Sequence, residues 1–88
     1  MEKKLQKHIL EQENLRVRKM LMLQRDGIES YIERLKRFEK RLDEIVRKAQ
    51  VRGERKLADL QRAEVSFRIS LLENEVRHIK RDIYFFSD

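Results

Sequence analysis

The chain has 88 residues, with 22 Lys or Arg against 16 Asp or Glu for a net charge of +6, and it contains no Pro, no Cys, no Trp and two Gly. This length allows one small domain, the lack of turn residues argues against a sheet protein, and the absence of cysteine excludes disulfide scaffolds and cysteine zinc sites. No apolar run approaches the roughly 20 residues that cross a bilayer, and residues 1–10 lack the apolar centre of a signal peptide. The regular recurrence of Leu, Ile and Val argues against disorder and predicts an all-α protein.

Residues 10–49 carry two apolar series, each with a period of seven residues. Together they form a repeat of alternating four- and three-residue steps over about 40 residues, which is typical of a coiled coil. Ile32 and Val46 widen the apolar face enough for a helical bundle. The predicted seam residues in this half are Leu10, Val17, Leu21, Ile28, Tyr31, Leu35, Phe38, Leu42 and Ile45.

The repeat resumes after Gly53 in a different frame. The frame is displaced by one residue, and one residue rotates a helix surface by about 100°. The two halves therefore do not share one straight seam. The predicted seam residues in this half are Val65, Ile69, Leu72, Val76, Ile79, Ile83 and Phe86.

A helical hairpin accounts for the displaced frame. We expect one coiled-coil module over residues 1–88, with a helix over about 3–51, a turn over about 51–55 near Gly53, and a second helix over about 56–86. Antiparallel packing would then pair Ile28 with Ile79, Tyr31 with Val76, and Phe38 with Ile69. Gly27 does not disturb the first frame, so we expect it inside the helix. The alternative is one long continuous helix in a parallel coiled-coil dimer.

A single hairpin leaves much apolar surface uncovered. The segment from Leu5 to Val17 overhangs the expected end of the second helix. Large exposed apolar patches are unusual in monomers, so we expect a homo-oligomer, with a dimer favoured, or a partner helix, or both. The second helix also carries a second apolar face, made of Leu57, Leu60, Phe67 and Leu71.

The chain lacks the residues that catalysis needs. The two histidines, His8 and His78, are far apart in sequence, and neither belongs to a zinc-binding helix motif. No serine lies in a glycine elbow, and no glycine-rich phosphate loop is present. We therefore expect no enzyme activity, no cofactor, no metal site and no small-molecule substrate.

The positive charge is concentrated in the first 52 residues, which contain 15 Lys or Arg and nine Asp or Glu. This part of the chain could either bind a polyanion or form the solubilising outer face of a coiled coil. The candidate polyanion contacts are Arg16, Arg18, Lys19, Lys36, Arg37, Lys40, Arg47 and Arg52.

Two functions follow from these patterns. The first is a non-enzymatic, intracellular coiled-coil module for oligomerisation and protein–protein scaffolding. The alternative is a polyanion-binding helical module that uses residues 16–56 on a microtubule or, as the next choice, on nucleic acid. For either function we expect the cytoplasm, with a cytoskeletal site as one option and the nucleus left open.

Overall fold

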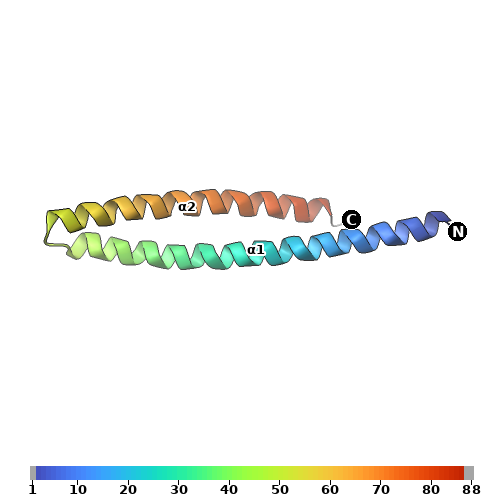
Figure 1. The fold of residues 1–88 in the computed structure, drawn as a ribbon, viewed down its shortest axis with the longest axis horizontal. Helices are drawn as coiled ribbons and strands as arrows, with labels where there is room; N and C mark the ends of the chain where they lie inside the picture. The colour runs from blue at the N-terminus through green and yellow to red at the C-terminus, as the bar shows by residue number, and fades with distance from the viewer. Residues whose placement is uncertain (1, 87–88) are drawn as a thin grey trace.

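The computed structural model describes residues 2–86, which form two long helices, α1 (Glu2–Lys48) and α2 (Arg52–Phe85). The helices run antiparallel, side by side, and α1 extends beyond the end of α2 (Figure 1). The molecule measures 76 × 14 × 13 Å. No strand occurs among the described residues, so the fold is all-helical and extended. Residues 1, 87 and 88, which belong to the predicted module, lie outside the described residues.

Helix α1 continues through Gly27 without a break. A glycine in a helix interior costs about 1 kcal/mol relative to alanine. Apart from its chain neighbours and the local helix backbone, a Cβ placed on Gly27 would meet no atom within 4 Å, so contacts within the chain do not explain the missing side chain.

The turn comes earlier than the sequence predicts and does not use Gly53. The N–H of Ala49 still donates to the carbonyl of Ile45 at 2.8 Å, whereas Val51 is extended, with φ −97° and ψ 125°. The N–H of Arg55 then donates to the carbonyl of Val51 at 3.2 Å, so Gly53 lies in the first turn of α2. Because the reversal uses an extended residue and no left-handed one, a β-branched valine suits it and glycine is not needed.

The hairpin core is a single seam between the two helices. Its buried cluster contains Ile32, Ile69 and Val76, with half-buried aliphatic side chains packed around it. On α1 two columns of residues face α2. The central column is Leu21, Ile28, Leu35, Leu42 and Ala49, and the inner column is Arg25, Ile32, Glu39 and Val46. The seam residues on α2 and at its C-cap, Phe86, are Ala58, Arg62, Val65, Ile69, Leu72, Val76, Ile79, Ile83 and Phe86.

The expected pairing of Tyr31 with Val76 and of Phe38 with Ile69 does not occur. Tyr31 is 41% exposed and Phe38 44% exposed, and Ile45 in the same series is 49% exposed. The seam instead uses the neighbours one residue later, such as Ile32 at 6% exposure and Val46 at 9%. Consecutive residues differ by about 100° around a helix, so α1 is rotated relative to the expected orientation.

Cross-helix polar contacts give a physical reason for this rotation. It brings Asp43 to the edge of α1 next to α2, where its carboxylate lies 2.7 Å from the guanidinium of Arg62. It also allows the hydroxyl of Ser66 to donate to the carboxylate of Glu39. A rotation that buried Tyr31 and Phe38 would turn these acidic groups away from α2.

Residues 2–17 form an N-terminal extension that α2 does not cover (Figure 1). Every described side chain from Lys3 to Val17 is exposed, and Arg18 is the first half-buried one. In this extension the two columns that face α2 continue as Lys7, Glu11 and Asn14. The hairpin seam therefore loses its apolar residues near the point where α2 ends, and the predicted seam residues Leu10 and Val17 are exposed.

Candidate interaction surfaces

One edge of the hairpin seam is polar. The ammonium of Lys80 lies 3.4 Å from the carboxylate of Glu29, and Arg62 bridges Asp43 at 2.7 Å and Asp59 at 2.8 Å. The hydrogen bond to Asp43 is the main reason that the pKa of Arg62 lies above its ordinary value, and the charges of Asp59 and Asp43 add to it. Partly exposed pairs of this kind contribute little stability, so they favour this placement of the helices only weakly.

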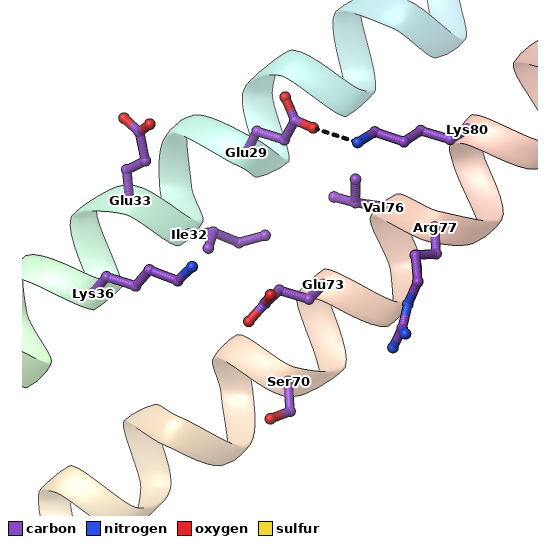
Figure 2. Close-up of a pocket in the computed structure, with 9 residues that line it drawn as sticks. All are labelled: Glu29, Ile32, Glu33, Lys36, Ser70, Glu73, Val76, Arg77 and Lys80. Carbon is purple, nitrogen blue, oxygen red and sulfur yellow. Dashed lines mark ion pairs between the residues drawn. The ribbon is translucent and has the colours of Figure 1, made fainter.

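A shallow groove runs along this polar edge (Figure 2). Ile32 and Val76 point into it from opposite helices, and the Glu29–Lys80 pair spans it. Lys36 and Glu73 point toward one another across the same groove in Figure 2. The groove is open, and the Glu29–Lys80 ion pair joins the two helices across it, which suits a structural seam rather than a ligand pocket.

The opposite edge of the seam is apolar. One series of exposed residues, the α1 stripe, follows the length of α1 with a period of seven residues. Its apolar members are between 37% and 58% exposed, and the polar Gln24 fills the third place. The stripe consists of Leu10, Val17, Gln24, Tyr31, Phe38 and Ile45.

A second apolar series, the α2 stripe, lies on the side of α2 that is turned away from α1. Its four members are separated by three, seven and four residues, spacings that keep them on one face of a helix. They are between 55% and 66% exposed. The stripe consists of Leu57, Leu60, Phe67 and Leu71.

The candidate polyanion contacts do not form one surface. Lys36 points into the groove of the polar edge (Figure 2), and Arg18 is half-buried near the end of α2. The remaining members are exposed and are spread along α1 and the start of α2: Arg16, Lys19, Arg37, Lys40, Arg47 and Arg52. One cluster of positive charge lies at the turn, where residues 47–56 contain five Lys or Arg and one acidic residue.

The cross-helix contacts of Arg62 and Glu39 were not predicted from the sequence. Both residues occupy positions where the heptad pattern of a seam calls for an apolar residue, and this departure is the only signal that could have indicated them. Among the described residues no group of three or more His, Asp and Glu is arranged to hold a metal ion.

Comparison with protein-family models, with curated proteins and with solved structures finds no match to this chain. No helix within residues 2–86 is long and apolar enough to cross a membrane.

Proposed function

We propose that this chain is a coiled-coil module for oligomerisation and protein–protein scaffolding. The single observation that carries the proposal is the exposure of two apolar stripes on a molecule whose seam buries, among the described side chains, seven residues to 9% or less. A hairpin 14 Å thick has no interior to receive these side chains. An amphipathic helix can cover these side chains by packing its own apolar face against them.

The proposed mechanism is helix-to-helix packing. The α1 stripe lies directly beside the central column of the hairpin seam, so a helix that docks there would enlarge the existing core. Side chains such as Phe38 would supply affinity by leaving water. Charged residues beside the stripe, such as Arg34 and Arg41, would select the partner and its direction.

The test is the absolute mass of the 88-residue chain in solution, measured by light scattering together with circular dichroism. We expect a mass above that of one chain at micromolar concentration, and we expect it to persist at high salt because apolar packing is not screened. A fully helical species of 10.9 kDa at every concentration would contradict the proposal.

The basic turn supports polyanion binding as a second candidate function. Arg47, Lys48, Arg52, Arg55 and Lys56 lie at one end of the hairpin, where a linear polyanion could contact several of them at once. Binding to taxol-stabilised microtubules and to duplex DNA should weaken steeply as salt rises. Binding that is absent at low salt would remove this candidate and leave the scaffolding proposal unaffected.

A further inference from the structure

We infer that the α1 stripe is the contact surface for a second copy of this chain, and that the two α1 helices pack antiparallel with their two-fold axis beside Gly27. This inference rests on the proposed function and names the partner, the surface and the direction. The second copy is favoured over an unrelated helix because two copies of the stripe that run in opposite directions match each other in position and in charge.

The positions of the stripe residues give the first argument. Six residues with a period of seven, from Leu10 to Ile45, have their midpoint between residues 27 and 28. An antiparallel copy centred there places Leu10 against Ile45 of the other copy, Val17 against Phe38, and Gln24 against Tyr31. A shift by one heptad leaves an exposed apolar side chain unmatched at an end, so the centred arrangement covers the most apolar surface.

Gly27 gives the second argument. It lies three residues after Gln24, on the same side of α1, and apart from its chain neighbours and the local helix backbone no atom lies within 4 Å of the place where its Cβ would be. Glycine allows the backbone of a neighbouring element to approach closely. At the two-fold axis the Gly27 residues of the two copies would face each other, which gives a helix-destabilising residue a packing role that the single hairpin does not provide.

The charges beside the stripe give the third argument. The exposed residues three positions after each stripe residue are Glu13 and Met20 in the first half and Arg34, Arg41 and Lys48 in the second. In a parallel copy Glu13 of one chain and Arg41 of the other would lie about 42 Å apart along the helices and could not pair. In the antiparallel copy Glu13 lies opposite Arg41 twice, once on each side of the axis.

Cysteine cross-linking tests this arrangement, because the chain contains no native cysteine. Variants Glu13→Cys and Arg41→Cys are oxidised mildly, separately and as an equal mixture, and the products are identified by mass spectrometry. We expect the mixture to give the mixed disulfide-linked dimer and neither variant to cross-link efficiently alone, because Glu13 of one copy and Glu13 of the other lie about 42 Å apart in this register. Efficient cross-linking of Glu13→Cys with itself would overturn the antiparallel arrangement.

A matched pair of phenylalanine variants identifies the surface. Phe38→Ser should raise the dissociation constant of the dimer at least tenfold, whereas Phe67→Ser on the α2 stripe should leave it unchanged. Circular dichroism establishes that both variants remain helical. If the wild-type chain associates but only Phe67→Ser dissociates it, this inference is wrong and the proposed function stands. If the wild-type chain does not associate, both the inference and the proposed self-assembly are wrong.

Discussion

The ammonium of Lys80 on α2 lies 3.4 Å from the carboxylate of Glu29 on α1, although 51 residues separate them in the sequence. This contact defines the hairpin, because in a continuous helix the same residues would be about 77 Å apart. Both side chains are roughly half exposed, so the pair indicates how the helices are placed without stabilising them strongly.

The first prediction uses these two residues directly. Glu29→Cys and Lys80→Cys in one chain, carrying spin labels and diluted with unlabelled protein, should give a distance below about 25 Å, which allows for two label arms across one helix pair. Double electron–electron resonance measures this distance. A peak beyond about 60 Å would show a continuous helix and would remove the basis for the hairpin.

The second prediction concerns the central column. Leu35→Asp places a charge in the region packed against the buried cluster and should cost at least about 2 kcal/mol of the free energy of unfolding. Arg37→Asp is the matched control, because it lies two residues away on the exposed side and should change this free energy by no more than about 0.5 kcal/mol. Urea unfolding followed by circular dichroism compares them. Equal losses would mean that the columns are misassigned.

The third prediction separates the hairpin core from the α1 stripe by means of two adjacent residues. Val46→Ala removes a side chain that is 9% exposed and should lower the free energy of unfolding by about 1–2 kcal/mol at every protein concentration. Ile45→Ala removes one that is 49% exposed and should weaken only the concentration-dependent part of the stability. Thermal unfolding over a hundredfold range of concentration distinguishes the two effects. A concentration-independent loss for Ile45→Ala would place Ile45 in the hairpin core.

The fourth prediction concerns the turn. Two glycines inserted after Gln50 lengthen a connection that makes no regular helix, and loop closure depends weakly on length, so the melting temperature should fall by only a few degrees. The same two glycines inserted after Gly53 enter the first turn of α2 and should cost about 2 kcal/mol. Differential scanning calorimetry of both variants provides the comparison. A larger loss of stability for the insertion after Gln50 than for the insertion after Gly53 would show that the turn lies near Gly53.

The fifth prediction concerns Arg62. Arg62→Gln removes the charge that bridges Asp43 and Asp59, so it should lower the melting temperature slightly at low salt and by less at high salt. Because the pKa of Arg62 is raised in the folded chain, the charged side chain stabilises the fold at every pH below the ordinary arginine pKa. This stabilisation is lost only as pH rises through the raised pKa. The effect of Arg62→Gln should therefore be the same at pH 7 and pH 10. A loss of stability that differs between pH 7 and pH 10 would show that another titrating group contributes to this contact.

The sequence by itself determined the all-helical fold and the existence of two long amphipathic segments, because heptad periodicity and the scarcity of turn residues are local properties of the chain. It also indicated that the seam changes frame near residue 53. The frame of α2 could be predicted because its seam repeat continues without a gap from Val65 to Phe86, whereas the α2 stripe has four members. The central column of α1, including Leu35 and Leu42, could be predicted because it has apolar residues on both sides.

Only the tertiary structure decided which side of the central column faces α2. Tyr31 and Ile32 are both apolar enough for a seam, and a single partner helix can cover the column of one or the other but not both. The orientation found brings together pairs such as Asp43 and Arg62, which no local pattern relates. The turn lies earlier than expected for a similar reason. An extended valine can reverse the chain as well as a left-handed glycine can, so local sequence does not distinguish a turn at Val51 from one at Gly53. The packing of the two helices distinguishes them.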